Sequence, residues 1–182
     1  MQKEIEIKAR LNDKEAVMQK LRDLGCVFED PITQEDVVYA ENVSSLKDFR
    51  VNNTIFLRIR IKNGKKIIFT VKKRMANDLD ALEAEVEVSN SKSMEDTILL
   101  MGYKEAVRVS KTRIITHYNG CEICIDDVAN LGAFIEMEKL ADEGDSSLIQ
   151  EELFVFFESL GIKREDRAFV GYDVLILEKK GV

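Results

Sequence analysis

The sequence has 182 residues, of which 45% are hydrophobic and 34% are charged, with one proline and no tryptophan. This length suits a single domain with a substantial core, and the composition is that of a soluble globular protein rather than a disordered chain. The formal net charge of -7 argues against a nucleic-acid surface, and it would repel a polyanion unless cations were clustered locally or metal ions accompanied the ligand.

The first predicted element is a strand over residues 3–11, KEIEIKARL. In an extended chain alternate residues share a face, so the charged side chains lie together: Glu4, Glu6, Lys8 and Arg10. The opposite face is apolar: Ile5, Ile7, Ala9 and Leu11. The chain start has no apolar signal segment, and no run approaches the roughly 18 apolar residues of a membrane span. We therefore expect a cytoplasmic protein.

Three segments have helical periodicity and end at a glycine: residues 13–25, 93–102 and 145–161. In the first, Asp13 is the predicted N-cap and Gly25 fits the position just past the helix, where a left-handed backbone is needed. The predicted apolar stripe of this helix consists of Val17, Leu21 and Leu24.

The other helical segments have start signals of their own. Ser93 followed by Asp96 resembles a capping box, and Asp145 or Ser146 begins the third helix. A fourth helix over residues 166–178 is predicted less distinctly, because the same segment is compatible with a strand.

Most of the remaining sequence is strand-like. The further predicted strands are residues 33–40, 54–62, 65–73, 82–89, 107–117, 120–127 and 132–140. Asn63-Gly64 and Asn119-Gly120 separate pairs of these strands, and Asn-Gly is a strong signal for a tight hairpin. Residues 41–53 and 74–81 are predicted loops, and no composition shift marks a domain boundary.

The strands share one pattern, a charged face opposite an apolar face. A single strand of this kind is usually just half exposed to water, but seven with acids and bases in separate rows favour another arrangement. The helices need the apolar faces to pack on, which leaves the charged faces together on the other side of the sheet. We therefore predict an α+β fold: a closed eight-stranded antiparallel barrel with a charged interior and helices packed outside.

Such an interior must hold water, metal and ligand, because burying unpaired like charges is very costly. The bases suit a chain of phosphates, since Arg binds phosphate oxygens in pairs and Lys supplies a point charge. They are Lys8, Arg10, Arg58, Arg60, Lys72, Lys111 and Arg113. The acids suit hard divalent cations such as Mg2+ or Mn2+. They are Glu4, Glu6, Glu83, Glu85, Glu87, Asp126, Glu136 and Glu138.

Other chemistries have weaker support. Three cysteines favour a reducing compartment over a disulfide framework. Cys121 and Cys124 form a C-x-x-C, but in a strand this spacing puts the two thiols on opposite faces, so we interpret them as ordinary buried residues. His117, which is the sole histidine, has no nucleophile motif around it and is expected in a structural or rim position.

The ordered charged motifs resemble those of the CYTH, or triphosphate tunnel metalloenzyme, superfamily. Residues 4–8 (EIEIK) match its E-x-E-x-K signature. The remaining matches follow in order: residues 34–36 (QED) with Tyr39, 57–60 (LRIR), 70–72 (TVK), 83–87 (EAEVE), 111–113 (KTR), Asp126, and 136–138 (EME). They span nearly the whole chain. The resemblance implies one domain over residues 1–182 and an eight-stranded tunnel barrel, and the context EIEIKARL is most similar to the class IV adenylyl cyclase branch.

The resemblance also implies roles for the charged residues. Two divalent metals would be held by Glu4, Glu6, Asp126, Glu136 and Glu138. The triphosphate would be held by Lys8, Arg58, Arg60, Lys72, Lys111 and Arg113, of which Lys8, Lys111 and Arg113 would be catalytic. Glu83, Glu85 and Glu87 would bind metal or support its ligands. No task is implied for Gln34, Asp36 or Tyr39, and Arg10 would lie at a tunnel end.

The resemblance therefore implies an enzyme that converts ATP to cyclic AMP and pyrophosphate, with Mg2+ or Mn2+. Alternatives are a hydrolase of tripolyphosphate, thiamine triphosphate or nucleoside triphosphates, and a non-catalytic polyphosphate-binding module. The expected partner is a small triphosphate, with no nucleic acid and no membrane. Exposed strand or helix surfaces could support a homodimer.

Overall fold

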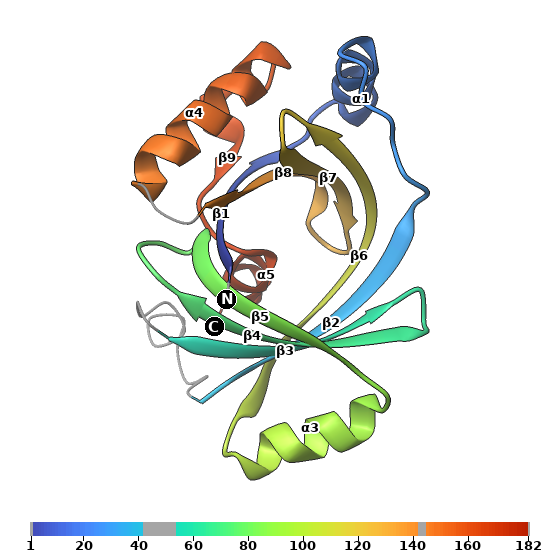
Figure 1. The fold of residues 1–182 in the computed structure, drawn as a ribbon, viewed down its shortest axis with the longest axis vertical. Coiled ribbons are helices and arrows are strands. Elements are labelled where there is room, and N and C mark those ends of the chain that lie inside the picture. Colours follow the sequence, from blue (N-terminus) through green and yellow to red (C-terminus); the bar gives the residue numbers. More distant parts are fainter. Residues whose placement is uncertain (1, 42–53, 142–144, 182) are drawn as a thin grey trace.

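The protein is described by a computed structural model covering residues 2–41, 54–141 and 145–181 (Figure 1). The predicted loop 41–53 lies almost wholly outside the described residues. The strands are β1 (Gln2–Arg10), β2 (Ile32–Ala40), β3 (Ile55–Lys62), β4 (Lys66–Arg74), β5 (Asp80–Val88), β6 (Lys104–Tyr118), β7 (Cys121–Val128), β8 (Gly132–Ala141) and β9 (Arg167–Ala168). The helices are α1 (Lys14–Asp23), α3 (Ser91–Leu100), α4 (Ser146–Ser159) and α5 (Tyr172–Lys180), with a short 3-10 turn at Arg164–Asp166.

Eight strands form the closed antiparallel barrel that the sequence predicts. The order around it is β1, β5, β4, β3, β2, β6, β7 and β8, and the pairing of β1 with β5 closes the ring. The predicted loop 74–81 is shorter than expected, because Arg74 still pairs with Ala81 as part of the β4–β5 ladder. The short β9 pairs with β1 at Lys8 and Ala9, beyond the part of β1 that β5 covers.

Both Asn-Gly pairs form the tight turns predicted from them. Asn63 and Gly64 have φ of 50° and 64°, and Asn119 and Gly120 have φ of 49° and 76°. Two successive positive φ values match the right-handed twist of the flanking strands, which fixes the hairpin register. These registers place the interior residues of neighbouring strands side by side.

Two helices differ in detail from the prediction. In α1, Asp13 caps the N-terminus by accepting a hydrogen bond from Ala16 N, and Gly25 has φ of 85°. Leu24 is not part of the buried stripe, however, since it is 46% exposed and Met18 is buried instead. The helix ends at Leu24, so the residue no longer follows the helical period.

The capping box predicted at Ser93 is wrong. The helix begins earlier, and Asn90 is the N-cap, with its side chain accepting from Ser93 N at 2.8 Å. An Asn side chain accepts a hydrogen bond from a free amide of the first turn as well as a Ser hydroxyl does. Asn90 and Ser93 were therefore both possible N-caps from the sequence. In α4 the N-cap is Asp145, one of the two predicted starts.

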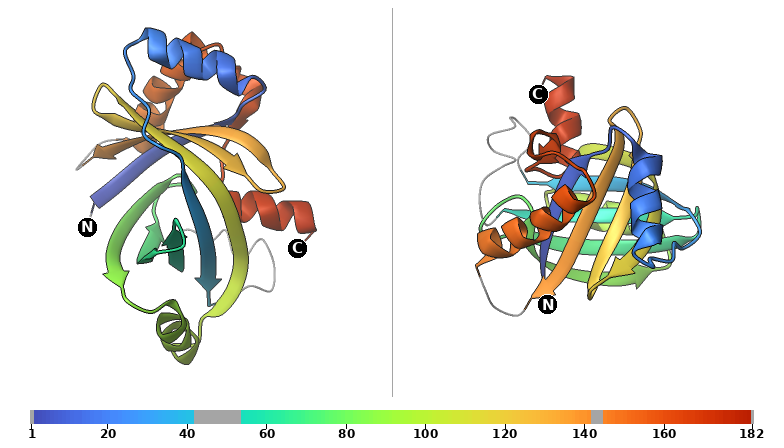
Figure 2. Two further views of the ribbon diagram at one scale, coloured as in Figure 1. Left: turned by 90° about the vertical axis from the view of Figure 1, so that its right-hand side faces the viewer. Right: turned by 90° about the horizontal axis from the view of Figure 1, so that it is seen from above.

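Helices cover the apolar outer faces of the barrel, as expected (Figure 2). Residues of α1 and α4 pack with the outward side chains of β1, β7 and β8 in one cluster that includes Leu21, Ile123, Phe154 and Phe157. On the opposite wall Ile98 of α3 packs with residues of β2 and β3. No helix of the described part of the chain is long and apolar enough to cross a membrane.

The C-terminal helix lies at one end of the barrel rather than around it (Figure 1). The predicted helix over 166–178 is partly wrong, since a 3-10 turn and β9 come first and α5 begins at Tyr172. The inward side chains at this end are apolar and pack with α5 and the segment before it. The two clusters concerned include Val38, Phe56, Val107, Val109, Val128, Phe134, Val170, Tyr172, Val174 and Leu177. The interior is therefore charged along most of its length and closed by apolar packing at one end.

Candidate functional site

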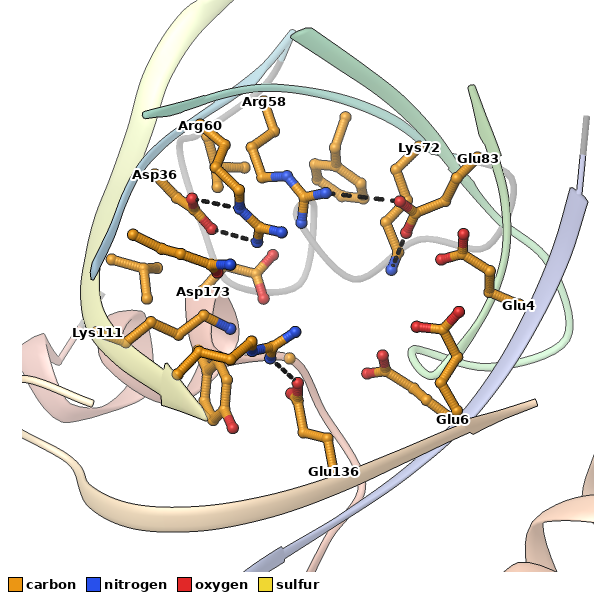
Figure 3. A pocket seen from close by; sticks show the side chains of 18 of the residues that line it. Glu4, Glu6, Asp36, Arg58, Arg60, Lys72, Glu83, Lys111, Glu136 and Asp173 are labelled. Carbon is orange, nitrogen blue, oxygen red and sulfur yellow. Dashed lines mark hydrogen bonds and ion pairs between the residues drawn. The ribbon is translucent and has the colours of Figure 1, made fainter. Parts of the chain in front are cut away.

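The barrel encloses a cavity of about 320 Å3, lined mainly by charged side chains (Figure 3). Its lining includes eight Lys or Arg residues and ten Asp or Glu residues. Strand alternation produces this lining, and the cross-strand register sets it in order. Glu6 lies opposite Glu138, and Lys8 lies opposite Glu136, on the β1–β8 ladder.

One wall of the cavity carries arginines from β3. Asp36 accepts two hydrogen bonds from Arg60, at 2.7 and 2.6 Å, and both residues are buried. Burial opposes ionisation of Asp36, yet the Arg60 guanidinium holds the pKa of this carboxyl well below its usual range. Arg58 lies 3.1 Å from Glu85 and 3.6 Å from Glu83, so the guanidinium groups of this wall are held in place by carboxylates.

The β6 wall presents Lys111 and Arg113, which share Asp126. The Arg113 Nε donates to Asp126 Oδ1 at 2.7 Å, and Lys111 Nζ donates to Oδ2 at 3.0 Å. Arg113 also donates to Glu136. Burial, together with the nearby Arg113 charge, lowers the pKa of Lys111 to about 8. Two cations are thus held close together by a carboxylate that is itself fully buried.

Lys8 joins this group from β1. Its ammonium lies 2.9 Å from Glu136 and 3.4 Å from Glu6, and the residue is only 2% exposed. The ring of Tyr172 lies beneath both lysines, with its centroid 4.2 Å from Lys8 Nζ and 4.8 Å from Lys111 Nζ. A tyrosine face stabilises a desolvated ammonium, so α5 contributes to the basic group.

Acids gather on the β1 side of the cavity, and Figure 3 shows Glu4 and Glu6 there, across from Arg60 and Lys111. Burial and the charges of Glu83 and Glu138 raise the pKa of Glu4 to about 8. Burial and the charges of Glu6 and Glu122 raise the pKa of Glu138 to about 7. Burial is the larger cause of both shifts, and repulsion between neighbouring carboxylates adds to it.

This donor set fits a hard divalent cation, which carboxylate oxygens bind and which would relieve their mutual repulsion. Glu83 is different. Burial opposes its ionisation, but Lys72 and Arg58 lower its pKa to about 2, so its charge is already balanced. Among the described residues no three His, Cys, Asp or Glu side chains are arranged as a finished metal site.

The structure brings most of the predicted site residues into this one cavity. Its lining includes Glu4, Glu6, Lys8, Arg58, Arg60, Lys72, Glu83, Glu85, Lys111, Arg113, Glu136 and Glu138. Asp126 is not among the lining residues, because Lys111 and Arg113 cover it from the cavity side. Glu87 is also absent from the lining and is exposed, with its carboxylate 3.3 Å from Lys66.

The residues without a predicted role occupy different positions in the barrel. Gln34 and Asp36 line the cavity, whereas Tyr39 faces outward and packs with Ile98 of α3. Arg10 is exposed and donates to the backbone carbonyl of Leu131. The side chain of His117 is 62% exposed, at the end of β6.

Several lining residues were not among the predicted site residues. Besides Gln34 and Asp36, those with polar side chains are Lys62, Arg74, Asp78, Glu122, Tyr172 and Asp173. Lys62 lies on the same strand face as Arg60, and Glu122 lies on the same strand face as Asp126. The alternation of each strand therefore indicates that both side chains face the interior. Tyr172 and Asp173 lie on a helix whose docking depends on the whole barrel, and the sequence carries no local signal for it.

The cysteines have the arrangement predicted for them. Cys121 belongs to the outer apolar cluster, while the Cys124 thiol lies 3.3 Å from Glu122, on the inner face. Burial raises the pKa of Cys124, to above the range in which a thiolate forms readily. All three cysteines are free and buried.

The chain is similar to several known proteins. "Putative adenylate cyclase MJ0240" from Methanocaldococcus jannaschii is 31% identical over 166 residues, which cover 90% of this chain and 92% of that protein. The structure of PH1819 from Pyrococcus horikoshii OT3 is 27% identical with a TM-score of 0.78, covering 97% of this chain and 99% of its own.

A more distant structure is that of a Hippeastrum protein, HpAC1, described as a "putative adenylyl cyclase" with a dominant triphosphatase activity. It is 15% identical with a TM-score of 0.58, covering 100% of this chain and 96% of its own, and so shares the fold alone. The CYTH domain model matches residues 2–172, which takes in the whole barrel and ends at the first residue of α5. The chain therefore belongs to the CYTH domain family.

Proposed function

We propose that this protein is a metal-dependent enzyme that acts on a triphosphate, and that its reaction is the cyclisation of ATP to 3′,5′-cyclic AMP and pyrophosphate. The observation that carries the proposal is that one cavity holds both fixed buried bases and a group of carboxylates buried beside one another. A polyphosphate supplies oxygens for the bases, and its accompanying cations supply charge for the carboxylates.

The charge balance makes the cations necessary. Ten acidic and eight basic residues line the cavity, so a highly charged anion gains little from entering it alone. The bases would hold the phosphate oxygens: Lys8, Arg58, Arg60, Lys72, Lys111 and Arg113. An arginine can present two N–H groups to one phosphate, which favours one orientation of the chain.

The carboxylates best suited to hold Mg2+ or Mn2+ are Glu4, Glu6 and Glu138, because burial and mutual repulsion leave two of them short of positive charge. Glu136 and Asp126 are held by the bases instead. A bound divalent cation would supply Lewis acidity at the phosphate oxygens and acidity to a coordinated hydroxyl.

In the proposed reaction the 3′-hydroxyl oxygen of ATP attacks the α-phosphorus. The new P–O bond closes the cyclic diester and the hydroxyl proton passes to solvent. The bond from the α-phosphorus to the bridging oxygen breaks, and pyrophosphate leaves with that oxygen. Lys8, Lys111 and Arg113 lie within one hydrogen-bonded group and would neutralise charge on the leaving pyrophosphate.

Hydrolysis of a triphosphate is the second candidate, because the same bases would serve it with water in place of the ribose hydroxyl. The triphosphatase activity described for HpAC1, which has this fold, supports keeping it. A module that only binds polyphosphate has less support, since binding needs chiefly the bases and leaves the carboxylate group without a task.

The products distinguish these candidates. The protein is incubated with ATP and with tripolyphosphate in Mg2+ or Mn2+, and cyclic AMP, pyrophosphate and orthophosphate are measured. Cyclic AMP with equimolar pyrophosphate is the expected result. Orthophosphate without cyclic AMP would replace the cyclase by a hydrolase, and tight binding without any product would leave a binding module. Glu152→Gln, which removes an exposed charge on α4, is the matched control.

A further inference from the structure

Asp173 places a carboxylate at the closed end of the cavity. It follows Tyr172 in the first turn of α5 and lines the cavity, on the same side as Asp36 and Lys111 in Figure 3. Gly171 makes room for it, because a Cβ at that position would lie 2.2 Å from Asp173 Oδ1. The charge of Asp173 is one of those that raise the pKa of Lys8, so it acts on the basic group.

Apolar side chains line the cavity at the same end as Asp173. Val38, Phe56 and Val109 line the cavity and pack into the apolar clusters that hold α5 in place. An anionic chain that enters among the bases therefore meets, at this end, a carboxylate backed by apolar side chains. Both repel a further phosphate, the first by charge and the second by its inability to solvate an anion.

A negative charge in a phosphate site would be a handicap if its sole effect were to weaken binding. At a closed end its effect depends on position, because phosphates short of it contact the bases and a phosphate that reaches it does not. We infer that Asp173 is a specificity-determining residue that limits the length of the phosphate chain, favouring a triphosphate over longer polyphosphates. The inference rests on the proposed function and deepens it.

A structural role for Asp173 has a different signature. An acid in the first turn of a helix stabilises that helix through its dipole, by a few tenths of a kcal/mol to about 1 kcal/mol. Loss of that effect would lower the melting temperature and weaken all polyphosphates alike. A length limit instead changes the ratio of the affinities for short and long phosphate chains. The stability of the helix does not affect this ratio.

The test is a titration of the protein with linear tripolyphosphate and tetrapolyphosphate in excess Mg2+, by calorimetry. Asp173→Asn keeps the shape of the side chain and removes its charge, and Asp173→Ser repeats the test with a smaller residue that also suits a helix start. Glu152→Gln changes the net charge equally at an exposed residue outside the cavity lining. Melting temperatures establish that each variant is folded.

We expect wild type and Glu152→Gln to bind tetrapolyphosphate no more tightly than tripolyphosphate. In Asp173→Asn and Asp173→Ser, the affinity for tetrapolyphosphate relative to tripolyphosphate should rise about tenfold, the effect of one charge at close range. An unchanged ratio in folded variants that still bind tripolyphosphate would overturn the length limit and leave the proposed function standing. Wild-type protein that bound neither compound would overturn both.

Discussion

The Asp36 carboxylate accepts two hydrogen bonds from Arg60 while both residues are buried, which makes this pair sensitive to the loss of one partner. We predict that Asp36→Asn destabilises the protein by about 3 kcal/mol, because it leaves a buried guanidinium without its counter-charge. Urea unfolding measures the change. Asp127→Asn is the control, since its ion pair with Lys14 is largely exposed and is worth at most about 1 kcal/mol.

The same pair predicts a dependence on acid. The folded-state pKa of Asp36 lies below its unfolded value of about 3.9, so its contribution is complete above that value and is lost as the pH falls further. Stability measured from pH 5 to about pH 2 should therefore fall more steeply in wild type than in Asp36→Asn. Parallel curves would show that the pair contributes nothing through ionisation.

Arg113 contacts both Asp126 and Glu136, at the centre of the basic group. We predict that Arg113→Ala lowers turnover of the triphosphate by about 100-fold or more, as removal of a charge-stabilising donor does. Rates are compared per folded molecule, with circular dichroism to establish folding. Full turnover in a folded Arg113→Ala protein would exclude Arg113 from the reaction.

For a single residue, the sequence predicts which face of the strand the side chain occupies. It does not predict how deep in the barrel the side chain lies or which neighbours cover it. Asp126 has the parity of the metal-ligand candidates and is nevertheless covered by Lys111 and Arg113. Glu87 has the parity of Glu83 and Glu85, yet it lies in the exposed last part of β5. Depth along the barrel depends on strand tilt and on which long side chains meet, and neither is encoded in alternation.

Among the elements, α4 best shows how the outer faces of the barrel are stabilised. Phe157 is fully buried against the barrel, whereas Val155 on the same helix is 58% exposed. We predict that Phe157→Ala costs about 3–5 kcal/mol through lost burial and the cavity it leaves, and that Val155→Ala costs about 0.5 kcal/mol or less. Urea unfolding of both variants gives the comparison, and similar losses would contradict the inverted barrel.

Strands were more predictable than α5, and for a physical reason. Alternation and the Asn-Gly turns are local properties, so each strand and hairpin could be read without its neighbours, to within a few residues at the ends. The position of α5 depends on an apolar ring assembled from six different strands and loops, including Phe56 and Phe134. No local pattern in residues 166–178 indicates that ring.

For the whole molecule, the proposed binding of a triphosphate depends on the balance of acidic and basic side chains in the cavity. With more acids than bases in the lining, we predict that a chelator such as EDTA abolishes triphosphate binding, and that excess Mg2+ or Mn2+ restores it. Equilibrium dialysis with and without the chelator measures this. Undiminished binding in EDTA would show that the bases suffice and that the carboxylate group has another task.

The most direct test of the central claim is a calorimetric titration of tripolyphosphate into the protein with Mg2+, repeated with Arg58→Gln. We predict one binding site per chain in wild type, and binding weakened about tenfold or more in Arg58→Gln, because this arginine lines the cavity. Glu152→Gln should bind like wild type. Absence of binding in wild type, or equal binding in wild type and Arg58→Gln, would contradict a phosphate site inside the barrel.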